Sequence, residues 1–339
     1  MELDIEDFDA LRHYLTKRLN REPVAFKKLP GGVSNRTVQI TWEDGSSCVL
    51  KQALAKLRVK EDWFSSPERI HVEAGALRWL NRLAPAGTTP GFLFEDVQNH
   101  LMAMQAVPDP HENWKSQLLS GDVLFRHFEQ FGSLLGTIQR KSSQLRMELC
   151  PAFADTRYFE SLRLEPYYLF TAQKIPGAGD FLRALAEETL SHKLSLVHGD
   201  FSPKNTLVYQ GKLVLLDYEV VHFGDPAFDI GFALAHFLSK ANHLHWHRRA
   251  LMAGATVFWE TYLSEVASLG WDSFEPRAVR HALACLLARV EGKSPLEYLT
   301  APQAVRQFQA TLFLISHPPE TISGLIEEFH LRLGMHANH

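Results

Sequence analysis

The sequence is poor in cysteine, in long apolar runs and in clustered positive charge. Its 339 residues include three cysteines, which lie a hundred residues or more apart, so no two have the spacing of a metal-binding pair. Such sparse cysteines indicate buried free thiols in a reducing compartment rather than a disulfide framework. Apolar stretches such as Leu283 to Ala288 are far shorter than the roughly 20 residues that a membrane-spanning helix needs.

The charge pattern gives no sign of a polyanionic partner. The formal net charge is -4, and the lysines and arginines are scattered singly rather than in runs. We therefore expect neither nucleic-acid binding nor membrane binding. The first fifteen residues are acidic and amphipathic and lack the basic and apolar regions of a signal peptide. We expect a cytoplasmic protein, either a monomer or a homodimer.

The first third of the sequence favours a small sheet with two helices. Asp44-Gly45 separates two β-rich runs, which is a strong hairpin signal. Pro67 suits the first turn of a helix whose apolar residues form one stripe. The apolar patterns predict helices over 4–20 and 67–83 and strands over 24–29, 33–42, 47–52, 92–95 and 101–107.

The sequence changes character after Pro108-Asp109-Pro110, which we interpret as a hinge. One strand-rich island, at 196–197, 206–209 and 212–216, interrupts a run of predicted helices. These helices are predicted over 122–142, 178–192, 226–240, 244–268, 276–290, 302–316 and 319–333. The prediction is an α+β protein with a β-rich N-lobe, 1–107, a mainly helical C-lobe, 108–339, and a ligand-binding cleft between them.

The strand-rich island carries the strongest chemical signal. Asp200 is followed five residues later by Asn205, and Asp217 ends the next hairpin. This is the spacing of a kinase catalytic loop and its metal-binding carboxylate. Phosphoryl transfer needs one carboxylate to orient the acceptor hydroxyl and take its proton, and separate oxygen ligands for Mg²⁺ on the phosphates. Either aspartate alone would more simply cap a turn, but the ordered set favours chemistry.

The segment around Asp200, together with Phe223-Gly224-Asp225-Pro226-Ala227-Phe228-Asp229, resembles the aminoglycoside phosphotransferase and choline kinase superfamily. The resemblance extends from about Val24 to at least Pro295. It implies a bilobal protein-kinase-like fold and an ATP-dependent, Mg²⁺-dependent small-molecule kinase. It also implies that Asp200 is the base and that Asn205 and Asp217 hold Mg²⁺.

Three further residues near the motif have different expected roles. Glu219 lies two residues beyond Asp217; on a strand-like path its side chain would point to the same face, which makes it a third candidate metal ligand, although its role is undecided from the sequence. His198 more plausibly braces the loop than titrates. Asp229 is predicted to be a buried acceptor for amides of the catalytic loop.

The N-lobe supplies the predicted nucleotide site. Lys51 lies in an apolar strand and Glu73 on the following helix, where kinases pair such residues to hold the lysine over the α- and β-phosphates. A solvated lysine is the alternative. The predicted cover of the phosphates is the turn with Gly31, Gly32, Ser34 and Asn35, although a plain hairpin turn explains it almost as well.

The strand ending in Met104-Gln105-Ala106-Val107 is predicted to bind adenine through its backbone, with Gln105 and Val107 as the contacts. A buried edge strand without ligand contacts is the alternative.

The acceptor is less well defined. The run from Lys51 to Val59, with Glu73 to Leu77 after it, is similar to methylthioribose kinase, which implies a sugar-like acceptor. Ser202-Pro203-Lys204 departs from that family's catalytic loop. The candidate acceptor contacts are Trp114, Arg163, Tyr167 and Arg289. Each also has a structural alternative: packing on a helix for Trp114, helix termination for Arg163 and Tyr167, and a helix C-cap for Arg289.

Two other classes of function remain open. Residues 240–339 contain nine acidic and nine Lys or Arg residues, whereas a polycationic aminoglycoside needs an acidic pocket. An aminoglycoside or amino-alcohol kinase is therefore the alternative to a sugar kinase. A catalytically silent nucleotide-binding pseudokinase is opposed by the retained Lys51, Asp200, Asn205 and Asp217. Only eleven residues separate Asp217 from Asp229, which is too short for a peptide-docking activation loop and favours a small acceptor.

Overall fold

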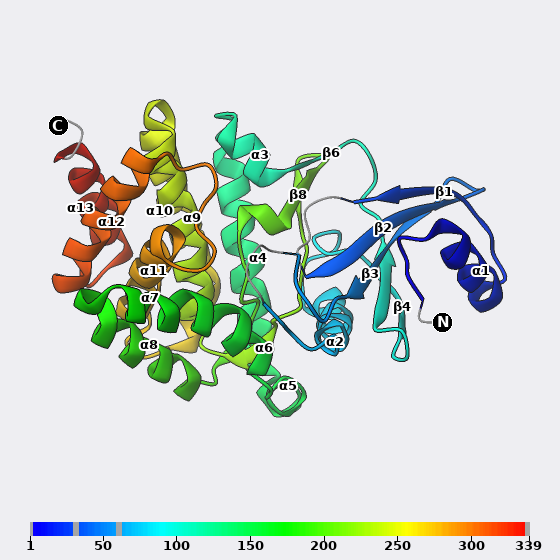
Figure 1. Ribbon diagram of the computed structural model, residues 1–339. Coiled ribbons are helices and arrows are strands. Elements are labelled where there is room, and N and C mark those ends of the chain that lie inside the picture. Colours follow the sequence, from blue (N-terminus) through cyan, green and yellow to red (C-terminus); the bar gives the residue numbers. More distant parts are fainter. Residues whose placement is uncertain (1–2, 30–33, 59–62, 336–339) are drawn as a thin grey trace.

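The computed structural model describes residues 3–29, 34–58 and 63–335 (Figure 1). Its N-terminal part is a five-stranded antiparallel sheet in the order β1-β2-β3-β5-β4. The strands are β1 (Pro23–Lys28), β2 (Asn35–Trp42), β3 (Ser47–Ala53), β4 (Phe92–Asp96) and β5 (Leu101–Gln105). The mixed α+β fold with a small antiparallel sheet and a helical remainder is confirmed.

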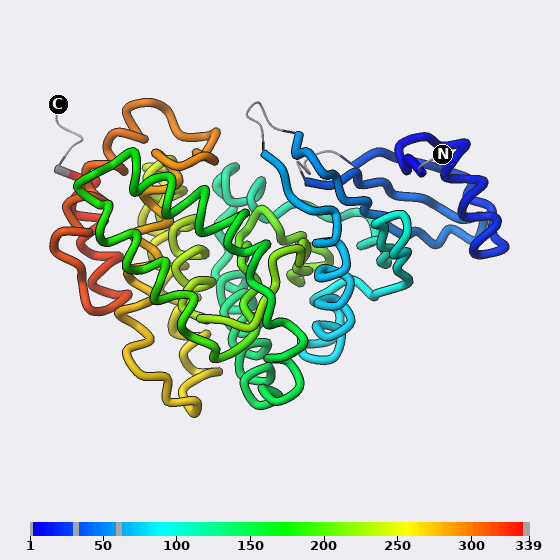
Figure 2. Tube along the Cα trace, turned by 60° about the horizontal axis from the view of Figure 1, so that its bottom comes forward, coloured from blue at the N-terminus to red at the C-terminus, as the bar shows by residue number. Residues whose placement is uncertain are grey.

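Two helices cover opposite faces of this sheet because side chains alternate along each strand. On one face Leu50 packs with Leu11 and Leu15 of α1 (Phe8–Leu19). On the other, Val49 packs with Leu77 of α2 (Arg69–Leu83). The face under α2 also meets the helical part, so α2 lies between the sheet and the main core (Figures 1 and 2).

The remainder is mainly helical, with α9 at its centre. Every residue from Ala227 to Asn242 in α9 is buried, which explains why its sequence is apolar on all sides. The helices are α3 (Trp114–Leu119), α4 (Phe125–Gln144), α5 (Arg146–Ala152), α6 (Arg157–Phe159), α7 (Phe170–Lys174), α8 (Gly179–Ser191), α9 (Ala227–His243), α10 (Arg248–Val266), α11 (Phe274–Glu291), α12 (Ala301–Ser316) and α13 (Ile322–Met335). Helix α13 lies at the end of the molecule opposite α1 (Figures 1 and 2).

Short strands hold the loops that face the sheet. Strands β8 (Thr206–Tyr209) and β9 (Lys212–Leu215) form the predicted hairpin, and β6 (His111–Asn113) adds a third strand. Strand β7 (Ser195–Val197) pairs with β10 (His222–Gly224). The loop with Asp200 therefore begins at one small sheet and ends at the other.

Some predicted local structure is wrong. Arg163 and Tyr167, for which helix termination was the structural alternative, lie inside a π-helix, η1 (Glu160–Leu169), rather than at a helix end. Pro67 precedes the first helical residue of α2 rather than lying in its first turn. The domain boundary at residue 107 stays a prediction.

Neither a membrane-spanning helix nor a disulfide is found among the described residues. No helix among them is both long and apolar enough to cross a membrane. Cys48, Cys150 and Cys285 are free thiols, as their spacing predicted.

Candidate active site

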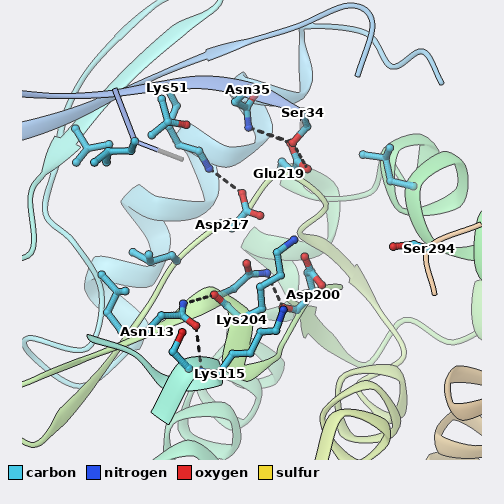
Figure 3. Close-up of a pocket in the computed structure, with 18 of the residues that line it drawn as sticks. Ser34, Asn35, Lys51, Asn113, Lys115, Asp200, Lys204, Asp217, Glu219 and Ser294 are labelled. Carbon is cyan, nitrogen blue, oxygen red and sulfur yellow. Dashed lines mark hydrogen bonds and ion pairs between the residues drawn. The ribbon is translucent and has the colours of Figure 1, made fainter. Parts of the chain in front are cut away.

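A cavity of about 1220 Å³ lies between the sheet and the helical part. Its walls come from β1, β2, β3 and β5 on one side and from the loop with Asp200, the π-helix and α11 on the other. Figure 3 shows Lys51, Asn35 and Ser34 entering from the sheet, and Asp200, Lys204 and Lys115 from the opposite side. Most of the predicted site residues that the structure describes thus share one cavity.

Lys51 joins two carboxylates at the sheet side of the cavity. Its Nζ lies 2.5 Å from Oε1 of Glu73 and 2.7 Å from Oδ1 of Asp217. Burial alone would lower the pKa of Lys51, but the charges of Asp217 and Glu73 outweigh it and raise that pKa. The lysine is therefore a fixed cation. The predicted Lys51–Glu73 pairing is present, while its role toward a nucleotide stays a prediction.

Asp217 follows β9 in a left-handed conformation, with φ 70°, which aspartate tolerates better than most residues. Burial would raise the pKa of its carboxyl, but the Lys51 charge outweighs this and lowers the pKa. Asp217 thus stays ionised and can bind a cation. Asn205 lies close by, because the amide of Leu216 donates to its carbonyl at 2.8 Å.

Asp200 is the buried carboxylate on the opposite wall. Nη2 of Arg163 lies 2.9 Å from its Oδ2, and Nδ2 of Asn205 donates to its carbonyl oxygen at 3.1 Å. Burial would raise the pKa of Asp200, but the charges of Arg163 and Lys204 outweigh it and hold the pKa below its usual value. The carboxylate is ionised and ready to accept a hydrogen bond from a hydroxyl.

The loop that carries Asp200 is fastened to α9. Asp229 accepts hydrogen bonds from the amides of His198 at 2.7 Å and Gly199 at 2.8 Å, which confirms its predicted role. Gly199 has φ +75°, and a Cβ there would lie 2.8 Å from Val220 Cγ2, so glycine suits this turn for two reasons. Burial lowers the pKa of His198 to about 4, and Nδ1 of this neutral ring accepts from the amide of Asp200 at 3.2 Å. His198 therefore braces the loop.

Glu219 is held by residues from the sheet side. Its Oε1 accepts from the Ser34 hydroxyl at 3.0 Å, and its Oε2 accepts from Asn35 Nδ2 at 3.3 Å. Nε of Arg69 lies 3.1 Å from the same Oε2. Both carboxylate oxygens are thus occupied, and Glu219 as a metal ligand stays a prediction. Gly31 and Gly32 lie outside the described residues.

The end of β5 lines the cavity at Gln105 and Val107. The amide of Gln105 donates to Gly91 at 2.8 Å, and that of Ala106 donates to Ser47 at 3.2 Å. Within the described chain the amide of Val107 makes no hydrogen bond. Of these three amides, it is the one without a partner in the described chain.

Three of the four predicted acceptor contacts line the cavity, namely Arg163, Tyr167 and Arg289. The expectation for Trp114 is wrong. Its side chain is fully buried and packs edge-on against Phe128 and Phe131 in the core. An indole at the start of a helix can pack into the core as readily as it can line a cleft, and the indole of Trp114 packs into the core.

The sequence that contains these site residues matches a known protein family. Residues 25–276 match the model of the phosphotransferase enzyme family, which is most of the chain and includes Lys51, Asp200 and Asp217. The chain belongs to this family.

Curated relatives in the phosphotransferase family include methylthioribose kinases. The chain is 26% identical over 258 residues to that of Citrobacter koseri, covering 68% of this chain and 63% of the relative. It is 27% identical over 257 residues to that of Yersinia pseudotuberculosis, covering 68% and 62%. The chain thus spans less than two thirds of the length of these relatives.

Solved structures of phosphotransferases share the fold. An amicoumacin kinase in complex with AMP-PNP, Ca²⁺ and Ami has a TM-score of 0.56 at 16% identity, covering 93% of this chain and 96% of that one. A choline kinase from Cryptosporidium parvum has a TM-score of 0.50 at 11% identity, covering 97% and 94%. These likenesses confirm the kinase-like fold.

Sequence reasoning about this phosphotransferase missed two buried residues of the site. Arg69 lies four residues before Glu73 on α2, and His236 lies seven residues after Asp229 on α9. These spacings place each on the same helix face as a residue already singled out. Helix periodicity was therefore the signal that would have found them.

Proposed function

We propose that this protein transfers the γ-phosphate of ATP to a hydroxyl of a small, sugar-like metabolite. The observation that carries the proposal is the placing of Asp200 and the Lys51–Asp217 pair on facing walls of one cavity. A phosphotransferase needs a group that orients the hydroxyl and separate cationic groups that hold the phosphates. Asp200 serves the first need and Lys51 the second.

The donor set fits Mg²⁺. No three His, Cys, Asp or Glu side chains within 3–29, 34–58 and 63–335 are grouped closely enough to bind a metal by themselves. Mg²⁺ in phosphoryl-transfer sites commonly takes one or two carboxylates and completes its shell with phosphate and water. Asp217 and Asn205 would hold the Mg²⁺ ion, and the ion would neutralise charge on the phosphates. Glu219 would become a further ligand if its carboxylate left Arg69.

The other residues proposed for the site bind the nucleotide or transfer a proton. Val107 offers its unpaired amide to the adenine, and Lys51, held by Glu73, pairs with the α- and β-phosphates. Asp200 accepts the hydroxyl proton as the bond from acceptor oxygen to γ-phosphorus forms and the bond from that phosphorus to the bridging oxygen of ADP breaks. The products are ADP and a phosphate ester.

Two alternatives are tested in the same assay. An aminoglycoside or amino-alcohol kinase would use the same phosphate-binding residues with a cationic acceptor, and a silent nucleotide-binding protein would transfer nothing. ADP release is measured with Mg·ATP over panels of sugars and sugar derivatives, amino alcohols and aminoglycosides. We expect turnover with a sugar derivative, and Asp200→Asn should lower that turnover by about 10²- to 10⁴-fold. Turnover only with cationic acceptors, or none above the Asp200→Asn background, would contradict the proposal.

A further inference from the structure

Arg289 is a buried cation whose partners are all neutral. It lies on α11 and is 7% exposed. Its Nη1 donates to the carbonyl oxygen of Ser294 at 3.0 Å and is 3.4 Å from that residue's Oγ, and its Nη2 donates to Nε2 of His236 at 3.0 Å. Its buried Nε has no hydrogen-bond partner in the described chain. A guanidinium has five N–H donors, so this one is incompletely satisfied.

The contrast with the other buried arginines of the site is clear. Arg163 pairs with Asp200, and Arg69 pairs with Glu219. Within the described residues no carboxylate oxygen lies within 4.0 Å of Arg289. Its guanidinium lies 4.8 Å from the ring centroid of Tyr167. Such a cation–π contact stabilises a buried cation less than a paired carboxylate does. A buried charge without a counter-ion is costly, so a negative ligand would be favoured here.

Other cations reinforce this end of the cavity. Lys204 and Lys115 extend toward Asp200 in Figure 3, with Ser294 across from them. The ammonium of Lys115 pairs with Glu297, whose side chain is 68% exposed, so solvent weakens that pair. Burial lowers the pKa of Lys240, behind the wall, to about 7, and the charges of Lys115 and Arg289 add to that lowering.

The carboxylates that line the cavity do not offset this charge. Asp200, Asp217 and Glu219 are each paired with a buried cation, and Glu297, which also lines the cavity, pairs with Lys115. Glu165 and Glu291 do not line the cavity. The acceptor end is therefore poor in free negative charge, although the charge count of residues 240–339 is balanced.

We propose that Arg289 and Ser294 form an anion subsite that binds a carboxylate or phosphate group of the acceptor while its hydroxyl faces Asp200. The inference rests on the proposed function and specifies its substrate class. The subsite lies on the acceptor side of the cavity because Arg289 packs on Tyr167. Tyr167 lies four residues after Arg163, and Arg163 pairs with Asp200. Nucleotide phosphates are served by Lys51 from the sheet side.

The test measures binding of three matched probes, ribose, ribonate and ribose 5-phosphate, by calorimetry. The full chain is first saturated with Mg·AMP-PNP, so that the nucleotide sites are filled. We expect ribonate or ribose 5-phosphate to bind at least about tenfold more tightly than ribose, since a charge-assisted hydrogen bond discriminates by roughly that factor or more. The stronger of the two anions identifies the group as carboxylate or phosphate.

Variants locate the binding. Arg289→Met should weaken the preferred anion by about 10- to 100-fold and leave ribose unchanged, and Arg289→Lys should restore part of the loss. Lys174→Met is the matched control, because Lys174 lies near the same helix end but pairs with Glu291 at 2.6 Å. If Arg289→Met does not fold, Lys115→Met provides the second variant, with a several-fold loss expected.

Three results would overturn the anion subsite: ribose binding as tightly as both anions, no binding of either anion, or anion binding that Arg289→Met and Lys115→Met leave unchanged. Failure of Mg·AMP-PNP itself to bind would instead contradict the proposed function. The probes would then be titrated without nucleotide, and the same comparison would decide the subsite.

Discussion

Arg69 and Glu219 form a buried ion pair that joins α2 to the segment beyond Asp217, with Arg69 Nε 3.1 Å from Glu219 Oε2. Arg69 also donates to the carbonyl oxygens of Ser65 and Ser66, each at 3.1 Å, and to that of Ser34. One fully buried side chain thus connects the start of β2, the loop before α2 and the segment that follows Asp217. The pair fixes how the sheet meets the segment that contains Asp217 and Glu219.

Replacement of Arg69 by Met should lower the free energy of unfolding by about 3 kcal/mol or more, because Glu219 would become an uncompensated buried charge. Urea unfolding followed by circular dichroism measures the change. Glu219→Gln in the same background should recover part of the loss, since the unpaired charge is removed. A loss below about 1 kcal/mol in Arg69→Met would show that the pair contributes little.

Asp200→Asn should lower kcat by about 10²–10⁴ while leaving the affinity for Mg·AMP-PNP unchanged. Asparagine preserves the size of the side chain but cannot accept the hydroxyl proton. Steady-state turnover of the acceptor found in the screen, with calorimetry of nucleotide binding, gives both quantities. Near-normal turnover in the purified variant would exclude this loop as the catalytic one.

Asp217→Asn should remove the dependence of nucleotide binding on Mg²⁺. In the native protein we expect AMP-PNP to bind more tightly with Mg²⁺ than with EDTA, because Asp217 would hold the ion and the ion would neutralise charge on the phosphates. In the variant the two affinities should converge. Lys212→Met, at the exposed start of β9, is the control and should retain the difference. A variant that keeps the full Mg²⁺ effect would place the ion on other ligands.

His222→Gln should make stability less sensitive to acid. Burial lowers the pKa of His222 to about 4, whereas an unfolded histidine titrates near 6.5. Between these values the unfolded chain binds the proton, so native stability is lost as pH falls from 6.5 toward 4. The loss is about 1.4 kcal/mol per pH unit, or about 3 kcal/mol in all.

The measurement is urea unfolding of native protein and variant at pH 7, 6, 5 and 4. The stability difference between them should shift by about 3 kcal/mol in favour of the variant across this range. Other titrating groups cancel in that difference. Parallel curves would mean that His222 titrates as in the unfolded chain.

The elements and the core of the candidate active site could be predicted because their signals are local. The apolar period of α2, the Asp-Gly turn and the ordered set Asp200, Asn205 and Asp217 each lie within a short stretch of sequence. The pairing of Lys51 with Glu73 followed from their places on a strand and the next helix. These relationships depend on spacing, which the sequence contains.

The rest depended on which groups meet across the fold. Nothing near Trp114 distinguishes a core indole from a cleft wall, and it packs against α4. The balance of charges in residues 240–339 did not predict the cavity, because Glu291 pairs outward with Lys174 while Arg289 faces neutral groups. A charge count holds no information on such pairings.

The hydrogen bonds from His198 and Gly199 to Asp229 have a consequence for hydrogen exchange. Both amides belong to a loop beside an open cavity, where exchange with solvent deuterium is ordinarily fast. Their acceptor lies on α9, the most deeply buried helix, so each amide is released only when the loop separates from the core. Their exchange should therefore be as slow as that of α9 itself and report global unfolding rather than loop motion.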